Sequence, residues 1–174
     1  MTKWSLVARV ALAVGVVIFV VFWTWALLFA SKEPINRIGD RPWAARAEQI
    51  CAAADKQRLA LADFRKMDNA TAGLVDERAD IVDHATDILE QMLDDVVAKP
   101  PTDAKGLDLV PQWEHDYRTY LADRRAFTAQ LRTSGKNKAF YETEASGIPI
   151  SEKIEAFAQD NRMPTCAPPR DLTR

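Results

Sequence analysis

The sequence predicts an all-α protein with an N-terminal transmembrane helix, then an antiparallel bundle of three to four helices, and an extended, disulfide-tethered C-terminal tail. Three observations predict this fold class. Residues 10–30 form one uncharged and almost entirely apolar run. Beyond residue 42, apolar residues recur at steps of three and four, the period of an amphipathic helix. No segment alternates apolar and polar residues for long enough to predict a strand.

The apolar run begins at Val10 and ends at Ala30. As a helix with a rise of ~1.5 Å per residue it spans roughly 30 Å, the thickness of the hydrocarbon core of a bilayer. It is longer than the apolar core of a cleavable signal peptide and lacks a small-x-small cleavage site, so we expect a permanent signal anchor. Trp4 near one end, with Trp23 and Trp25 near the other, suits aromatic residues at both membrane interfaces.

The basic residues beside this run leave its orientation open. Counting Lys and Arg alone would place the larger part of the chain in the cytoplasm, because two precede the run and four follow it (Lys3 and Arg9; Lys32, Arg37, Arg41 and Arg46). The very short N-terminal tail and the nearby Glu33 and Asp40 favour the opposite. With the cysteines considered below, we expect a cytoplasmic tail (residues 1–9), the anchor (10–30), a linker (31–42) and an exported helical domain (43–174) at the plasma membrane.

The first helix of the exported domain is predicted to run from the end of the linker to about Lys66. Asp40 suits the N-cap position, and Arg41 with Pro42 suits the first turn. One apolar stripe follows this helix: Trp43, Ala47, Ile50, Ala54, Leu61 and Phe64. Residues 67–71 are predicted to form a turn in which Asp68, Asn69 or Thr71 caps the next helix.

The second helix is predicted over residues 72–98. Its stripe contains Leu74, Ile81, Ala85, Ile88, Met92 and Val96, reinforced by Val82, Leu89 and Leu93. Its other face is acidic, and Lys99-Pro100-Pro101 ends it. After a loop over residues 102–110, the third helix is predicted over residues 111–133, ending at Ser134-Gly135. Its stripe contains Val110, Trp113, Tyr117, Tyr120, Arg124, Phe127 and Leu131.

A shorter fourth helix is predicted over residues 151–160, after an irregular stretch over residues 136–149. Ser151 suits its N-cap, and Ile150, Ile154, Phe157 and Ala158 are expected to face inward. Prolines at positions 164, 168 and 169 make the last residues an extended tail, which needs a tether other than a β-ladder. Successive antiparallel packing is the simplest arrangement of these helices.

Cys51 in the first helix and Cys166 in the tail are the only two cysteines of the chain. An even number of cysteines in an exported chain predicts a disulfide. This bond would attach the tail to the first helix. In the chain-entropy model, a cross-link that closes so long a loop stabilises the fold by roughly 4–5 kcal/mol. Two buried free thiols are the alternative if the domain is cytoplasmic.

Arg124 is a charged residue on the apolar stripe of the third helix, between Tyr120 and Phe127. A charge that faces a core has to be paired. One interpretation is an ion pair with an acidic residue of the second helix, or a side chain that reaches out to solvent. The other is an anion-binding position, with a polar ligand pocket around Arg124, Tyr120 and Tyr117. The aromatic spacing itself is typical of core packing.

Residues that commonly carry chemistry are few. His84 shares a helix face with Asp80 and Asp87, which is more typical of a solvated acidic face than of a metal site. His115 lies between two acidic residues, but neighbouring side chains on a helix point apart. The sequence contains no phosphate-binding loop and no serine-hydrolase, zinc-protease or C-x-x-C motif. We therefore expect no catalytic residue, no metal site and no cofactor.

The charge balance argues against a nucleic-acid partner, because 23 basic residues stand against 25 acidic ones and the net charge is −2. The charges are nevertheless segregated, since the second helix is acidic and the end of the third is basic. These two faces are predicted to meet or to be solvated; the alternative is a docking surface for a charged envelope partner.

Three short motifs carry a resemblance: ICAAA at residues 50–54, YLADRR at residues 120–125, and NRMPTCAPPRDL at residues 161–172. In these motifs and in its N-terminal span the chain resembles a group of uncharacterised actinobacterial proteins, single-pass and membrane-anchored, with an exported helical domain and a Cys-Ala-Pro-Pro tail. The resemblance implies a plasma-membrane location with an outward domain. Its matched residues include Cys51 and Cys166, which favours the disulfide, and it implies no catalytic residue.

The function expected from the sequence is a non-enzymatic, membrane-anchored extracytoplasmic domain that contacts proteins or the cell envelope. Its partner would be another protein or a second copy of the chain. The alternative is a ligand-binding helical bundle with a polar pocket near Arg124 and Tyr120. An enzyme of unknown class is the third hypothesis, and it requires a cleft that gathers a histidine with two acidic residues.

Overall fold

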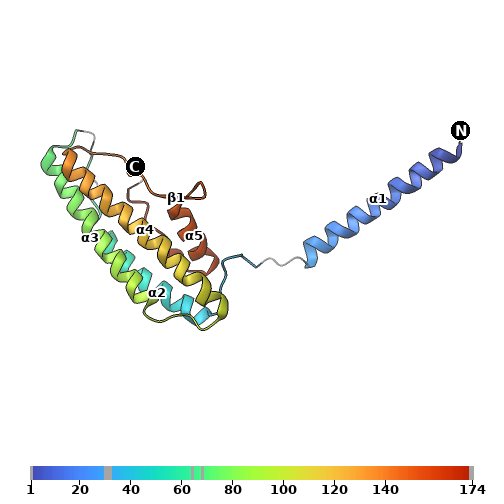
Figure 1. The fold of residues 1–174 in the computed structure, drawn as a ribbon, viewed down its shortest axis with the longest axis horizontal. Helices are drawn as coiled ribbons and strands as arrows, with labels where there is room; N and C mark the ends of the chain where they lie inside the picture. Colours follow the sequence, from blue (N-terminus) through green and yellow to red (C-terminus); the bar gives the residue numbers. More distant parts are fainter. Residues whose placement is uncertain (1, 30–32, 64, 68, 173–174) are drawn as a thin grey trace. The chain divides into compact units, whose positions relative to one another are not determined.

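The computed structural model describes residues 2–29, 33–63, 65–67 and 69–172, with only the helical backbone for residues 2–6 (Figure 1). The chain divides into two compact units, Met1–Pro34 and Ile35–Arg174. Each unit is described by itself below. Ala30, Phe64 and Asp68, which figure in the sequence predictions, lie outside the described residues, and so does the side chain of Trp4.

The first unit is a single helix, α1 (Thr2–Phe29). Within it, the 23 residues Val7–Phe29 are long and apolar enough to cross a membrane, with a mean hydropathy of 2.6. From Val10 to its end the helix carries no charged residue, so this part has no charged face of the kind that a surface helix presents to water. An apolar helix of this length is compatible with the predicted membrane anchor.

The second unit is built from α2 (Arg41–Leu59), α3 (Ala72–Val97), α4 (Ala104–Ser134), α5 (Ile150–Asp160) and a short 3₁₀ helix, η1 (Pro164–Cys166). The long helices α3 and α4 pack along each other (Figure 1). Helix α2 packs against α3 and η1, and α5 packs against α4. Two two-residue strands, β1 (Glu144–Ala145) and β2 (Ile148–Pro149), form an antiparallel hairpin.

The hairpin was not predicted, because two residues per strand are too few to produce an alternating pattern. Its turn contains Ser146 and Gly147, with φ of 59° and 75°. Positive φ at both turn positions matches the twist of a tight hairpin, and glycine adopts it without a steric cost.

Local hydrogen bonds, several of them from capping side chains, determine where the helices begin and end. Three of the predicted helix ends are wrong. Helix α4 begins at Ala104, not at residue 111, because Asp103 caps it and accepts from Gly106 N at 3.0 Å. Helix α2 ends at Leu59, not at Lys66, and Ala60 and Leu61 donate to carbonyls only three residues back. Ser151 is not the N-cap of α5: its N–H and hydroxyl both donate to the carboxylate of Glu142.

The predicted caps at the start of α2 and α3 are present. Asp40 accepts from Trp43 N at 2.9 Å, and Thr71, one of three predicted alternatives, accepts from Leu74 N at 3.3 Å. Gly135 ends α4 with a φ of 58°, and its N–H donates to Leu131 O. These caps satisfy backbone groups that a helix end otherwise leaves without partners.

Most of the core lies between α2, α3, α4 and α5 and includes both cysteines. A smaller apolar cluster lies between the start of α3 and the end of α4: Val75, Ala79, Val82, Phe127, Leu131 and Leu172. Of the apolar residues predicted to face the core from α3, Leu74, Ile81 and Ile88 are only half-buried, and the others are buried: Val82, Ala85, Leu89, Met92, Leu93 and Val96. Because α3 packs against both α2 and α4, its buried face is wider than one stripe.

Asp103 joins the linker to α4, which leads to a testable expectation. Besides capping α4, its carboxylate accepts from Gly39 N at 3.0 Å and from Asp40 N at 2.9 Å. We expect Asp103→Ala to lower the free energy of unfolding by about 1–2 kcal/mol, since three backbone N–H groups lose their acceptor. Asp103→Asn keeps one acceptor oxygen and should cost less. Urea unfolding of the full chain in detergent, followed by tryptophan fluorescence, measures both.

The same carboxylate predicts a pH dependence. Partial burial would raise the pKa of Asp103, but the hydrogen bonds from Gly39, Asp40 and Gly106 outweigh it and lower the pKa. A carboxylate whose pKa is lowered by folding stabilises the fold at neutral pH, and this contribution is lost as the pH falls through the lowered pKa. Equal stabilities of wild type and Asp103→Ala at neutral pH would contradict both expectations.

Candidate functional site

Arg124 lies on the buried face of α4, and its side chain is fully enclosed. Its Nε donates to the hydroxyl of Thr86 on α3 at 2.9 Å. The two terminal nitrogens donate to the two carboxylate oxygens of Asp171, at 2.8 and 3.0 Å. This bidentate geometry is the strongest arrangement in which an arginine pairs with a carboxylate. The cation on the apolar stripe is therefore paired inside the protein.

The partner of Arg124 differs from the predicted one. An acidic residue of the second helix was one of the predicted alternatives, with a side chain that reaches solvent as another, but Asp171 comes from the C-terminal tail. Arg58 of α2 also approaches the Asp171 carboxylate, at 3.9 Å, while pairing with Asp55. Burial alone would lower the pKa of Arg124, but its hydrogen bonds with Asp171 outweigh burial and raise the pKa.

Tyr120 and Tyr117 line the same side of α4, and both are buried. The hydroxyl of Tyr120 accepts from Arg124 at 3.4 Å and donates to Pro169 O at 3.0 Å, so it also contacts the tail. The hydroxyl of Tyr117 has no hydrogen-bond partner among the described residues. Burial raises the pKa of both tyrosines, which keeps both hydroxyls protonated at neutral pH.

The tail is held at several points. Cys51 and Cys166 form the predicted disulfide, with both residues fully buried. Next to it, Thr165 N donates to the Glu48 carboxylate at 3.1 Å. Beyond Asp171, Leu172 is buried in the smaller apolar cluster. The sequence analysis did not single out Asp171 or Thr86. The available signal for Asp171 was its place in a tail that needs a tether, next to the apolar Leu172.

The acidic face of α3 and the basic end of α4 meet. Arg125 pairs with Asp87 and Glu90, and Arg132 pairs with Asp80 and Asp83. Nearer the middle of α4, Arg118 pairs with Asp94. These charges are therefore engaged within the domain, which agrees with the interpretation that the two faces meet. Each such exposed pair contributes little, about 0–1 kcal/mol.

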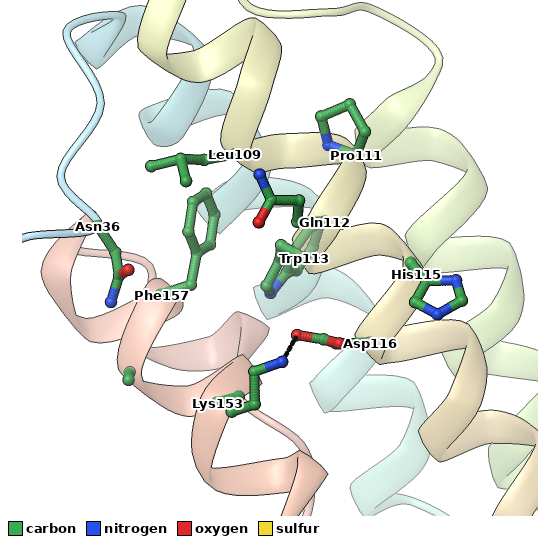
Figure 2. Close-up of a pocket in the computed structure, with 10 residues that line it drawn as sticks. Asn36, Leu109, Pro111, Gln112, Trp113, His115, Asp116, Lys153 and Phe157 are labelled. Atoms are coloured by element: carbon green, nitrogen blue, oxygen red, sulfur yellow. Dashed lines mark ion pairs between the residues drawn. The ribbon is translucent and has the colours of Figure 1, made fainter. Parts of the chain in front are cut away.

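A groove with a volume of about 530 Å³ lies along the first half of α4, against α5 and the linker (Figure 2). Its rim carries an ion pair between Lys153 and Asp116 at 2.9 Å. Trp113 and Phe157 stack with ring centroids 5.6 Å apart at its base, and the indole N–H of Trp113 is buried without a partner among the described residues. The remaining lining residues are Asn36, Leu109, Pro111, Gln112, His115 and Ala156.

The positions of the two histidines bear on the enzyme hypothesis and on metal binding. His84 and His115 are both exposed, on α3 and α4 respectively. Among the described residues, no group of three or more His, Cys, Asp or Glu side chains is arranged to hold a metal ion. His115 borders the groove, where one acidic residue, Asp116, is already paired with Lys153.

The fold and these contacts define a helical domain braced by a disulfide and a buried ion pair, preceded in the chain by an apolar helix. Compared with protein-family models, with curated proteins and with solved structures, the chain shows no match.

Proposed function

We propose that the protein is a single-pass, membrane-anchored domain that makes protein or cell-envelope contacts outside the cytoplasm and catalyses no reaction. Residues 10–30 cross the plasma membrane, residues 1–9 stay in the cytoplasm, and residues 43–174 form an antiparallel helical bundle with a tethered tail. The partner is another protein or a second copy of the chain. The observation that carries the proposal is the presence of a long apolar helix and a buried disulfide in one chain.

The disulfide supports the outward orientation, which the flanking charges leave open. Structural disulfides persist in oxidising compartments and are rare in the cytoplasm, where thiols are kept reduced. The Cys51–Cys166 bond joins residues 115 positions apart and is fully buried, as a structural bond would be. The resemblance of the tail and the first helix to actinobacterial membrane-anchored proteins favours the same location.

The contacts of Arg124 bear on the alternative, a ligand-binding bundle with a pocket near Arg124 and Tyr120. The guanidinium donates both terminal nitrogens to Asp171, and Tyr120 donates to the backbone of the tail. An external anion would therefore have to displace the chain's own carboxylate. This is the reason to prefer an interaction domain over a ligand-binding bundle.

Topology is the property that tests the proposal most directly. We expect a cysteine introduced at the exposed Lys138 to react with a membrane-impermeant maleimide on intact cells. A cysteine introduced at Thr2 should react only after permeabilisation. The native cysteines are the matched background, because a buried disulfide does not react with the reagent.

The reverse labelling pattern would contradict the outward orientation. Recovery of the full chain in the soluble fraction, with both introduced cysteines shielded in intact cells, would contradict the anchor itself. Non-reducing and reducing electrophoresis of the same samples reports the disulfide separately, so a failure of orientation and a failure of the bond can be told apart.

A further inference from the structure

After the disulfide, the tail continues as a short segment, residues 167–172, which we call the strap. The strap belongs to none of the described helices or strands, and two of its residues are prolines, which have no backbone N–H to donate. Its anchors include two side chains: Asp171 pairs with Arg124, and Leu172 is buried in the smaller apolar cluster. A short segment without regular backbone hydrogen bonding opens at a lower free energy than the whole domain unfolds.

The strap begins after the disulfide, so its opening does not require the domain to unfold. Cys166 is the last residue of η1, and its bond to Cys51 holds the tail on α2 up to that point. Opening residues 167–172 therefore breaks only the contacts of the strap itself. It uncovers the strap seat, which consists of Arg124 and the smaller apolar cluster between α3 and α4.

The strap seat accommodates one carboxylate next to one aliphatic side chain. Arg124 donates two hydrogen bonds to Asp171, and Arg58 approaches the same carboxylate at 3.9 Å. At the next position, Leu172 is only 4% exposed among apolar side chains of α3 and α4. A bidentate arginine in a desolvated site, next to apolar contacts, is the combination in which protein interfaces concentrate their binding energy.

Stability alone is a weak reason for burying this ion pair. Replacing a buried ion pair with apolar side chains of similar volume is often neutral or stabilising, because the desolvation of both charges offsets their attraction. The best-attested role of a buried charge is to specify which of several alternative arrangements forms. At the strap seat, the alternatives are the strap and another chain segment that carries the same two groups.

We propose that the protein partner binds at the strap seat, through an acidic residue followed by an aliphatic residue that take the places of Asp171 and Leu172. The inference rests on the proposed function and names the place and the chemistry of the protein contact. The strap competes with the partner at an effective concentration on the order of millimolar, because a short linker tethers it to its seat. A free anion lacks the aliphatic side chain and therefore displaces the strap poorly.

Methyl NMR of the full chain in detergent tests the proposal, with an acetylated peptide of residues 167–172 as the probe. Leucine methyl groups are labelled with carbon-13, and Leu172→Met assigns the signals of Leu172 by their loss. We expect about half of the Leu172 signal to move to random-coil positions at a peptide concentration in the millimolar range, on the order of the effective concentration of the strap. Leu93, fully buried in the main core, should keep its chemical shift and so shows that the domain stays folded.

Matched peptides separate the two contacts. Peptides that carry Asp171→Asn or Leu172→Ala should need concentrations at least about tenfold higher. In the chain variant Arg124→Met, the original and the Asp171→Asn peptide should become equivalent, because the guanidinium that distinguishes them is absent. Equal displacement by all three peptides from the wild-type chain, or displacement by acetate alone, would overturn the assignment to an acidic and aliphatic segment.

Two further outcomes would overturn the inference. Leu172 signals that stay in place at about 50 mM peptide, well above the effective concentration of the strap, would show that the strap is a fixed tether. A wild type that dimerises in detergent and dissociates when the peptide is added would assign the seat to the strap of a second copy. The topology labelling is independent of this experiment: an inward domain overturns the proposed function, whereas a strap that no peptide displaces overturns only this inference.

Discussion

Asp171→Asn is expected to lower the free energy of unfolding of the helical domain by about 3 kcal/mol. Arg124 is fully buried, and Asp171 supplies its counter-charge through two hydrogen bonds. Breaking a buried pair from one side costs about 3–5 kcal/mol, because the remaining charge is left uncompensated. The low end applies here, since the Asp171 side chain is 28% exposed and Asn keeps one acceptor.

The two partners of this pair should not be equivalent. In Arg124→Met the remaining carboxylate of Asp171 can turn toward water, so we expect a smaller loss, about 1–2 kcal/mol. The double variant Arg124→Met with Asp171→Asn should be more stable than Asp171→Asn alone, because no buried charge remains unpaired. Arg132→Gln is the matched control: its pairs with Asp80 and Asp83 are exposed and contribute less than about 1 kcal/mol.

Urea unfolding of the full chain in detergent, with the disulfide intact, measures these four variants. The order of stability of the four variants shows whether Arg124 carries a desolvated charge that Asp171 compensates. If Asp171→Asn proves as mild as Arg132→Gln, the guanidinium is not desolvated in the way the contacts of Arg124 indicate. If the double variant is no more stable than Asp171→Asn, lost packing rather than an unpaired charge is the cause.

Much of α4 could be predicted from its sequence, including the position of Arg124. Its apolar residues recur with a single helical period, and one helical face buries Trp113, Tyr117, Tyr120 and Arg124. Periodicity reports which residues share a face, so it also placed the cation in the core. The carboxylate that pairs with it could not be predicted, because Asp171 lies in an extended tail without periodicity. Pairing across 47 residues is set by tertiary packing.

The helix ends were less predictable for a related reason. The sequence predicts a loop over residues 102–110, but Asp103 caps a helix that begins at Ala104 and buries Gly106 and Val110. Glu142, not Ser151, supplies the acceptor at the start of α5. Both caps depend on which side chain reaches a free N–H in space, and sequence spacing does not determine that.

The disulfide is the second contact whose loss should be large. Replacing both Cys51 and Cys166 with Ala is expected to destabilise the helical domain by about 4–5 kcal/mol. The bond joins residues 115 positions apart, so in the unfolded chain it closes a long loop and restricts the ensemble strongly. Alanine is the suitable substitute because both positions are fully buried, where a serine hydroxyl would add the cost of an unsatisfied polar group.

The reduced wild type separates the effect of the bond from the effect of the side chains. It retains both sulfur atoms, so its stability relative to the oxidised protein reports the cross-link alone. We expect the loss to be accompanied by a steeper dependence of the unfolding free energy on urea, because an uncrosslinked unfolded chain exposes more surface. A reduced protein as stable as the oxidised one would contradict the loop-entropy argument.

The disulfide and the Arg124–Asp171 pair should also depend on each other. Both hold the same tail, with Asp171 only five positions after Cys166. While the disulfide is intact, the tail stays close to α4 and Asp171 has a high effective concentration at Arg124. Without the disulfide, the ion pair must order the tail alone, so Asp171→Asn should cost less in the Cys51→Ala, Cys166→Ala background. A double-mutant cycle with strictly additive losses would exclude this coupling.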